Sequence, residues 1–177
     1  MNKISIVGSG GSGKSTLARA LAVKLNMPVY HLDALYWKAG WKETERTEWR
    51  RIQEELCNRD KWIMDGNYAG TLDIRLIHSD TIIFLDINRY LCVARALWRS
   101  LLSYGKTRPD MAEGCEERID LRFIKWILDY PDKNKPELLM RLKARMPEKN
   151  VIILSSPRAV REFLRDVSGV SGGEAAR

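Results

Sequence analysis

The stretch GSGGSGKS, residues Gly8–Ser15, places four glycines ahead of a lysine and a serine. A short β-branched run at 3–7, KISIV, precedes it and favours a buried strand. Behind it, leucines recur every four residues from Leu17 to Leu25, which predicts an amphipathic helix over 14–26. A glycine-rich loop between a strand and a helix is the setting of a phosphate-binding loop.

The chemistry of this loop follows from the needs of a phosphate group. Glycines permit a tight path on which backbone N–H groups point inward, and the start of the following helix adds partial positive charge. We expect the Lys14 ammonium to reach the β- and γ-phosphates and the Ser15 hydroxyl to ligate Mg²⁺. The predicted nucleotide-binding residues are Gly8, Ser9, Gly10, Gly11, Ser12, Gly13, Lys14, Ser15 and Thr16. The alternative is a simple turn with a coincidental lysine, and the flanking strand and helix disfavour it.

Strand-like and helix-like segments alternate along the chain, which favours an α/β fold with a parallel sheet. The predicted strands are 3–7, 29–33, 62–64, 81–85 and 151–154, and the predicted helices are 14–26, 47–59, 88–102, 119–130, 136–145 and 157–167. Between 103 and 117 the periodicity gives way to Gly, Pro and charge, which indicates a mobile lid. We expect one domain over 1–168 and a frayed tail over 169–177.

Composition sets limits on the partners. The formal net charge of +7 and the pI of about 9.4 favour an anionic partner, which can be a nucleic acid or a nucleotide. No apolar run approaches the roughly 20 residues of a membrane span, and no signal-peptide pattern is present, so we expect a cytoplasmic protein without a membrane partner. The three cysteines are far apart and indicate neither a disulfide framework nor a zinc cluster.

Three predicted strands end at or near an acidic residue, where parallel sheets bind ligands. Asp65 is the best candidate to hold Mg²⁺, the alternative being an Asp that caps a turn with Gly66. Asp33 could accept a proton from a substrate hydroxyl, or it could be a helix N-cap. Asp86 is a weaker catalytic candidate, because Asn88 stands ready to cap the next helix.

Arginines gather on both sides of the predicted lid. Arg95 and Arg99 are four residues apart and share one helical face, while Arg108 and Arg118 lie at the lid itself. A solvated basic face is one explanation. Arginines delivered by a closing segment are worth about 10³ to 10⁵ in rate in P-loop enzymes, and we favour this clamp.

Longer motifs carry a family resemblance. The loop GSGGSGKST, HLDALYW at 31–37, WIMDGNY at 62–68 and RALWR at 95–99 are similar to those of the adenylate-kinase-related P-loop kinases. Within that group the chain most resembles the small bacterial proteins named DNA topology modulation proteins. The resemblance implies a five-stranded parallel sheet in the order 2-3-1-4-5, helices on both faces, a lid between the fourth and fifth strands, and the use of ATP and Mg²⁺.

The resemblance also assigns roles to the basic residues. It implies that Arg95 stacks on the adenine, that Arg99 contacts phosphates and that Arg108 faces the phosphates from the lid, with Arg118 matching the next lid arginine. The predicted catalytic residues are therefore Lys14, Asp33, Arg99, Arg108 and Arg118, and the predicted metal ligands are Ser15 and Asp65.

The acceptor half departs from adenylate kinases. Tyr36 and Ala69 stand where that family has arginines for a nucleoside monophosphate. The negative charge of a monophosphate would be poorly compensated unless Arg75 takes the place of these arginines. The sequence therefore predicts a kinase that phosphorylates a hydroxyl of a nucleoside or another small molecule. The alternative is an ATP-binding, nucleic-acid-associated regulator without metabolic kinase activity, and an ATPase without a separate acceptor has less support.

Overall fold

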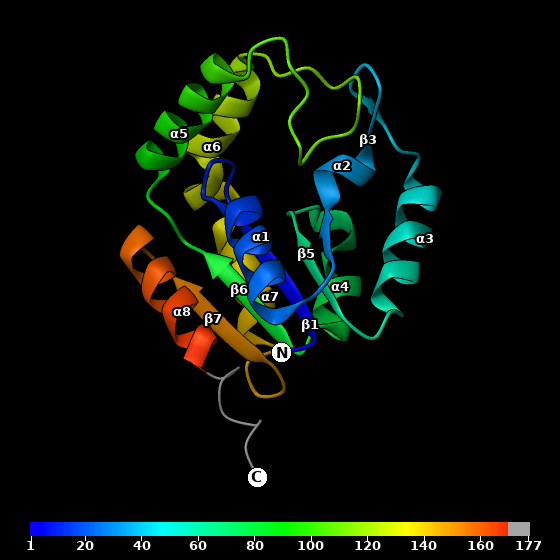
Figure 1. Cartoon of the computed structure of the whole chain (residues 1–177), viewed down its shortest axis with the longest axis vertical. Coiled ribbons are helices and arrows are strands. Elements are labelled where there is room, and N and C mark those ends of the chain that lie inside the picture. Colours follow the sequence, from blue (N-terminus) through cyan, green and yellow to red (C-terminus); the bar gives the residue numbers. More distant parts are fainter. Residues whose placement is uncertain (170–177) are drawn as a thin grey trace.

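The computed structural model describes residues 1–169 as a parallel sheet between layers of helices (Figure 1). The five-stranded sheet has the order β2-β5-β1-β6-β7. Its strands are β1 (Lys3–Gly8), β2 (Val29–His31), β5 (Trp62–Asp65), β6 (Thr81–Leu85) and β7 (Asn150–Leu154). Counted along the chain these strands are 1 to 5, so the order is the expected 2-3-1-4-5. The α/β class is confirmed, while the predicted tail, from residue 170 on, lies outside the described residues.

Helices cover both faces of the sheet, as their contacts show (Figure 1). The helices α1 and α8 pack on one face, and α4 and α7 pack on the other, while α5 and α6 pair beside the loop that follows β1. Their bounds are α1 (Lys14–Leu25), α3 (Arg46–Cys57), α4 (Leu72–His78), α5 (Arg89–Leu102), α6 (Leu121–Lys133), α7 (Lys135–Lys143) and α8 (Pro157–Gly169). Strands β1 and β6 are buried along almost their whole length, because both faces are covered.

The structure corrects three local expectations. Strand β2 ends at His31, and Asp33 lies in the first turn of the short helix α2 (Leu32–Tyr36), where the buried Leu32 anchors the turn. An antiparallel hairpin of β3 (Trp37–Lys38) and β4 (Lys42–Glu43) follows, which the sequence did not indicate. Helix α6 contains Pro131 instead of ending there, since burial of Tyr130 outweighs the local preference.

The predicted lid, between α5 and α6, lacks long regular elements and crosses toward the β3–β4 hairpin (Figure 1). The Gly40 N–H donates to the Gly114 carbonyl at 2.9 Å, and the Cys115 thiol donates to the Lys38 carbonyl at 3.3 Å. The lid is therefore in contact with the hairpin, and together they cover the carboxyl ends of the strands.

The thiols of Cys57, Cys92 and Cys115 are all free and buried. Cys57 ends α3, Cys92 lies in α5 and Cys115 in the lid, so each is enclosed by a different part of the fold. Within residues 1–169, no helix combines the length and the apolar character that crossing a membrane requires.

Candidate active site

The loop between β1 and α1 approaches its neighbours closely. Gly11 has φ +71°, and a Cβ there would lie 2.2 Å from the Cys92 carbonyl oxygen, so a larger residue meets both strain and a backbone clash. Gly13 has φ +99° and precedes the first turn of α1. These glycines let the loop fold tightly around the start of the helix, as the sequence predicts.

The Lys14 ammonium lies inside this loop. It donates to the carbonyl oxygens of Gly8 and Ser9, each at 2.9 Å. Burial lowers the pKa of Lys14, and the nearby carboxylates of Asp33 and Asp65 partly oppose this effect. A bound polyanion would favour the charged ammonium in the same way.

The loop contains two buried serine hydroxyls. Ser9 and Ser12 are 4% and 3% exposed, and within the described part of the chain their hydroxyl oxygens have no hydrogen-bond partner. Buried polar groups are nearly always satisfied. Neither serine lines the cleft described below, so these hydroxyls lie inside the loop and do not themselves point to a ligand.

Ser15 and Asp65 meet although they are 50 residues apart, because β5 lies beside β1 in the sheet. The Ser15 hydroxyl donates to Asp65 Oδ2 at 2.8 Å. Hydroxyl and carboxylate oxygens are hard donors of the kind that Mg²⁺ takes, and it commonly keeps several waters besides. The two predicted metal ligands therefore lie together in an arrangement that fits Mg²⁺. Phosphate oxygens of a bound nucleotide would supply further ligands to the ion.

Asp65 has a second partner that the sequence analysis missed. His31 Nδ1 lies 2.5 Å from Asp65 Oδ1, and this hydrogen bond raises the pKa of His31 against the opposing effect of burial. The last residue of β2 thus fixes the rotamer of the carboxylate at the end of β5. No spacing rule pairs residues 31 and 65, because only the register of β2 against β5 makes them neighbours.

Asp33 is held by Tyr68. The Tyr68 hydroxyl donates to Asp33 Oδ1 at 2.7 Å, and burial, followed by the negative charge of Asp33, raises the pKa of Tyr68. Asp33 is not the N-cap of α2, since His31 occupies that position. The structural alternative for Asp33 is therefore wrong, and its carboxylate lines the cleft instead.

Asn67 and Arg75 connect the acceptor side to the loop. Asn67 accepts from the Gly8 N–H at 3.0 Å and donates to the Gly8 carbonyl at 2.8 Å. Arg75 is fully buried and donates to the Gln53 side chain and to the carbonyls of Gly66 and Asn67. Burial lowers the pKa of Arg75 to about 10. Arg75 thus supports the chain after β5.

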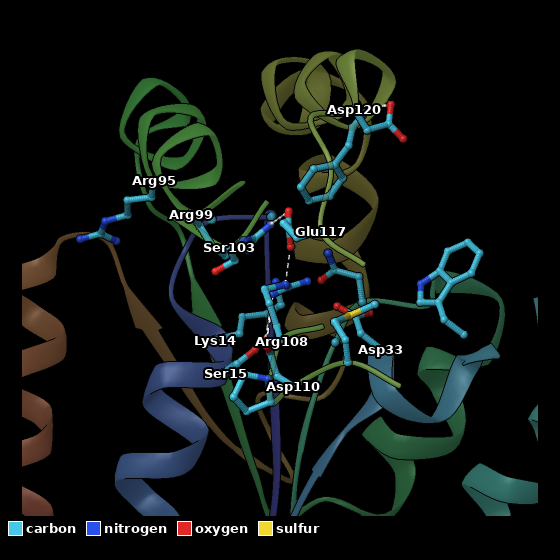
Figure 2. A pocket seen from close by; sticks show the side chains of 18 of the residues that line it. Lys14, Ser15, Asp33, Arg95, Arg99, Ser103, Arg108, Asp110, Glu117 and Asp120 are labelled. Atoms are coloured by element: carbon cyan, nitrogen blue, oxygen red, sulfur yellow. Dashed lines mark hydrogen bonds and ion pairs between the residues drawn. The ribbon is translucent and has the colours of Figure 1, made fainter. Parts of the chain in front are cut away.

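Arg99 of α5 and Arg108 of the lid converge on one buried carboxylate, Glu117, which is 6% exposed. Arg108 pairs with Glu117, and Arg99 Nη2 lies 3.8 Å from Glu117 Oε1 (Figure 2). The Ser100 hydroxyl donates to the same oxygen at 2.6 Å. Burial and the neighbouring Arg108 lower the pKa of Arg99. The sequence predicts the arginines but not the carboxylate that gathers them.

Asp110 brings a further lid carboxylate toward the loop (Figure 2). Arg108 Nη1 lies 3.1 Å from Asp110 Oδ2. Burial disfavours the charged form of Asp110, but Arg108, a hydrogen bond with Ser15 and the nearby His31 outweigh it and lower its pKa. The lid therefore contacts Ser15, one of the two candidate metal ligands.

The other predicted residues lie nearer the rim. Arg95 is exposed, and its Nη1 is 3.5 Å from the Ser12 carbonyl oxygen, so it lies over the outer side of the loop. Arg118 is exposed, with its guanidinium 5.6 Å from the centre of the Trp41 ring. Asp86 forms an ion pair with Lys135 at 2.7 Å, and it does not line the cleft.

A single cleft of about 1140 Å³ is lined by Lys14, Ser15, Asp33 and Tyr68, and by the arginines Arg95, Arg99, Arg108 and Arg118 with Asp110 and Glu117. Asp65 lies behind Ser15 and does not line the cleft itself. Lys14 and Arg95 lie on one side of the cleft and Asp33 lies on the other (Figure 2). Trp37, Trp41, Tyr68 and several lid residues also line it. Among the described residues, no cluster of three or more His, Cys, Asp or Glu side chains forms a ready-made metal site. The arrangement provides a phosphate-binding end and a second, aromatic end.

Comparison with models of known protein families identifies one match that covers most of the chain. Residues 1–116 of the 177 match the model of the NB-ARC domain, a P-loop NTPase domain. The chain belongs to the NB-ARC domain family. The match spans the loop, Asp33, Asp65 and most of the lid, and it does not distinguish the finer resemblance to DNA topology modulation proteins.

Solved structures similar to this NB-ARC-family chain include small P-loop kinases. A gluconokinase from Sinorhizobium meliloti 1021 has a TM-score of 0.55 and 17% identity, covering 95% of this chain and 90% of its own. Shikimate kinase from Acinetobacter baumannii, in complex with shikimate, has a TM-score of 0.56 and 16% identity, covering 97% and 93%. Shikimate kinase from Bacteroides thetaiotaomicron has a TM-score of 0.55 and 16% identity, and the match covers 95% of this chain and 96% of that kinase.

At these identities the likeness establishes the fold alone. A search of curated proteins gave no match. The chain is thus an α/β P-loop protein with the overall fold of small-molecule kinases, and its substrate follows only from its own residues.

Proposed function

We propose that residues 1–168 form one kinase domain, with a lid at about 103–117, that transfers the γ-phosphoryl group of ATP to a hydroxyl group of a small molecule. One observation carries the proposal: a single cleft holds the loop with Lys14 at one end and the Tyr68-bound carboxylate of Asp33 at the other, under the lid. A phosphoryl transfer needs a donor end and an acceptor end within reach of each other.

The donor end would bind the triphosphate. The backbone of Gly8–Gly13 and the Lys14 ammonium would neutralise its negative charge. Arg95 lies beside the loop and lines the cleft, so it would contact the adenine base of the bound nucleotide. The pair of Ser15 and Asp65 would hold Mg²⁺, which neutralises charge on the phosphate oxygens when bound.

The acceptor end would activate the hydroxyl. Asp33, oriented by Tyr68, accepts the proton of the acceptor hydroxyl as its oxygen forms a bond to the γ-phosphorus. The bond between that phosphorus and the β–γ bridging oxygen breaks, and its electron pair leaves with ADP. Arg99 and Arg108, gathered by Glu117, stabilise the charge on the transferred group.

Two substitutions separate binding from transfer. Lys14→Ala is expected to weaken Mg·ATP binding about 10- to 100-fold, the value of a charged hydrogen bond. Asp33→Asn should leave nucleotide affinity within about threefold and lower the transfer rate about 10²- to 10⁴-fold. The exposed Asp60→Asn is the matched control and should change neither. Calorimetry measures the first effect and product formation the second.

The proposal has a clear contrary result. If Asp33→Asn transfers phosphate at the normal rate, Asp33 is not the base. If ATP yields only ADP and inorganic phosphate with every acceptor offered, the chain is an ATPase and not a kinase.

The positive net charge of +7 favours a second candidate, an ATP-binding regulator associated with nucleic acid. Such a protein would lose DNA affinity steeply as salt rises, with a slope that reflects several phosphate contacts. The cleft arginines Arg99 and Arg108 are already paired with carboxylates, which supports the kinase instead. A steep salt slope in DNA binding, together with no phosphorylated product, would favour the regulator.

A further inference from the structure

We infer that the acceptor end of the cleft takes an uncharged, ring-shaped polyol, as found in sugars and nucleosides, and discriminates against acceptors that carry a phosphate or carboxylate group. The inference rests on the proposed kinase function, and it goes further by assigning the chemical class of the acceptor. It is based on three observations at that end of the cleft: the wall is aromatic, the polar groups are acidic, and the nearby arginines are bound to other groups or exposed.

The wall of the acceptor end is a continuous row of aromatic rings. The rings of Tyr68 and Tyr36 have centroids 4.7 Å apart, those of Tyr36 and Trp37 are 5.0 Å apart, and those of Trp37 and Trp41 are 5.6 Å apart. Tyr68, Trp37 and Trp41 line the cleft. Flat apolar faces with a few polar groups between them suit a ring-shaped ligand that packs its own face against an indole.

The packing fixes this wall in place. Trp49 is 4% exposed and packs against Tyr36 at 5.1 Å and against Tyr68 at 4.9 Å between ring centroids. The Trp41 indole N–H donates to the Glu116 carbonyl at 3.1 Å, which joins the wall to the lid. A preformed surface loses little conformational entropy when a ligand binds.

The polar groups at this end are acceptors of hydrogen bonds. Asp33 lies beside Tyr68, and Glu43 lines the cleft beside Tyr36, whose pKa is raised by burial and by a hydrogen bond with Glu43. Carboxylates accept hydrogen bonds from several hydroxyl groups of one polyol. They also repel an acceptor that brings its own negative charge.

The arginine that could have bound an anion is committed elsewhere. Arg75 donates from Nε to Gln53 at 2.9 Å and from Nη1 to the Gly66 carbonyl at 2.9 Å, with Nη2 bound to the Asn67 carbonyl. It is fully buried and does not line the cleft. The sequence left open whether Arg75 replaces the cations missing at Tyr36 and Ala69, and its position argues that it does not.

The remaining cations near this end are either paired with carboxylates or exposed. Arg108 is shared between Asp110 and Glu117. Among the described lining residues, Arg19 and Arg118 are exposed, and Arg118 lies over the Trp41 ring. An exposed cation screens an anion only weakly, whereas binding a phosphate or carboxylate in a cleft needs charge-assisted hydrogen bonds that replace its hydration.

Matched ligand pairs test this discrimination. Adenosine is compared with AMP, and glucose with glucuronate, because the members of each pair differ by one anionic group and the two pairs separate nucleosides from sugars. Binding is measured by calorimetry with Mg²⁺ and a saturating non-hydrolysable ATP analogue, and transfer is measured with ATP. We expect the neutral member of at least one pair to bind at least tenfold more tightly than its anionic partner.

A charge reversal at the rim of the wall tests the cause. Glu43→Lys should reduce the ratio of neutral to anionic affinity by about two- to fivefold, since it replaces a repelling group with an attracting one at an exposed position. Glu55→Lys makes the same change on the exposed face of α3, outside the cleft, and should leave the ratio unchanged. Trp37→Ala should weaken both members of the pair equally, because it removes packing surface and no charge.

The outcomes separate this inference from the proposed function. Phosphate transfer to AMP or glucuronate as efficient as to their neutral partners overturns the inference and leaves the kinase intact. Failure of adenosine and of glucose to bind also overturns it. Selective binding of a neutral member without any phosphorylated product supports the acceptor class and overturns the kinase.

Discussion

At the scale of single residues, Gly11 is where the nucleotide loop tolerates least change. Its φ of +71° is costly for any other residue, and an added Cβ would overlap the backbone of Cys92 on α5. The clash involves a carbonyl oxygen, not a flexible side chain, so it cannot be relieved without moving α5 or the loop.

Gly11→Ala is therefore expected to lower the free energy of unfolding by about 2–4 kcal/mol and to weaken nucleotide binding. Gly70→Ala is the matched control, because a Cβ at Gly70 meets open space, and its effect should stay below about 1 kcal/mol. Urea unfolding of the two variants checks the prediction. Equal stabilities would show that the loop adapts to a side chain.

Sequence patterns located the residues whose roles depend on local spacing. Lys14 and Ser15 follow from the loop, and Asp33 and Asp65 from strand positions. His31 and Glu117 could not be located in this way, because their partners lie far along the chain and meet only through strand register or lid packing. The motif around Tyr68 and Asn67 was recognised, but not the hydrogen bonds that these residues make.

At the scale of elements, the lid is organised by Glu117. This buried carboxylate gathers the guanidinium groups of Arg99 and Arg108 and the hydroxyl of Ser100. Without it, two neighbouring cations would repel each other in a buried site, and this cost would destabilise the packing of the segment between α5 and α6.

Glu117→Gln should destabilise the closed lid by about 1–3 kcal/mol. Trypsin cleavage at Lys106 in the lid, or at Arg118 directly after it, should then be on the order of tenfold faster than in the wild-type protein. Glu113→Gln changes an exposed glutamate of the same lid and serves as the control. Unchanged cleavage in the Glu117 variant would mean that hairpin contacts alone hold the lid.

Asp80 joins the starts of two central strands. It accepts from the backbone N–H groups of Asn2 at 2.6 Å and Lys3 at 3.0 Å. Burial disfavours the charged form, but these bonds and one with Thr81 outweigh it and hold the pKa of Asp80 below 3.8. Its stabilising effect is present above pH 3.8 and is lost as the pH falls through the folded-state pKa.

Asp80→Asn is expected to cost about 1 kcal/mol at pH 7, and this difference from the wild type should shrink below pH 3.8. Urea unfolding at pH 7, 4.5 and 3 measures it, with Asp60→Asn as an exposed control. A difference that stays constant across this range would contradict the assignment.

Periodicity predicted most elements to within a few residues, since their buried faces are continuous. It failed for α2 and the β3–β4 hairpin, which are short and depend on tertiary support. It also ended α6 too early, because the proline signal is local while the burial of Ile127 and Tyr130 is not.

At the scale of the whole molecule, ligand binding should be visible as stability. A non-hydrolysable ATP analogue with Mg²⁺ at 100 times its dissociation constant adds about 2.7 kcal/mol, which for a chain of this size raises Tm by about 5–10 °C. Thermal unfolding with and without the analogue measures the shift. Lys14→Ala should show a much smaller shift at the same concentration, and an unchanged one would argue against the loop as the binding site.

The sheet order and the position of the lid were both anticipated by the family resemblance, and the structure confirms the sheet order. The contact between the lid and the β3–β4 hairpin was not anticipated, because it joins segments that share no periodic pattern.

The three buried thiols allow local opening of the protein to be measured by their chemical reactivity. Burial raises the pKa of Cys57 to about 11 and also raises that of Cys92, so neither supplies much reactive thiolate at neutral pH. Cys115 is shielded by the lid and the hairpin. A maleimide should therefore modify Cys115 when the lid first lifts and reach the other two thiols only when the central sheet opens. Labelling followed by mass spectrometry then measures the rates of the two events separately.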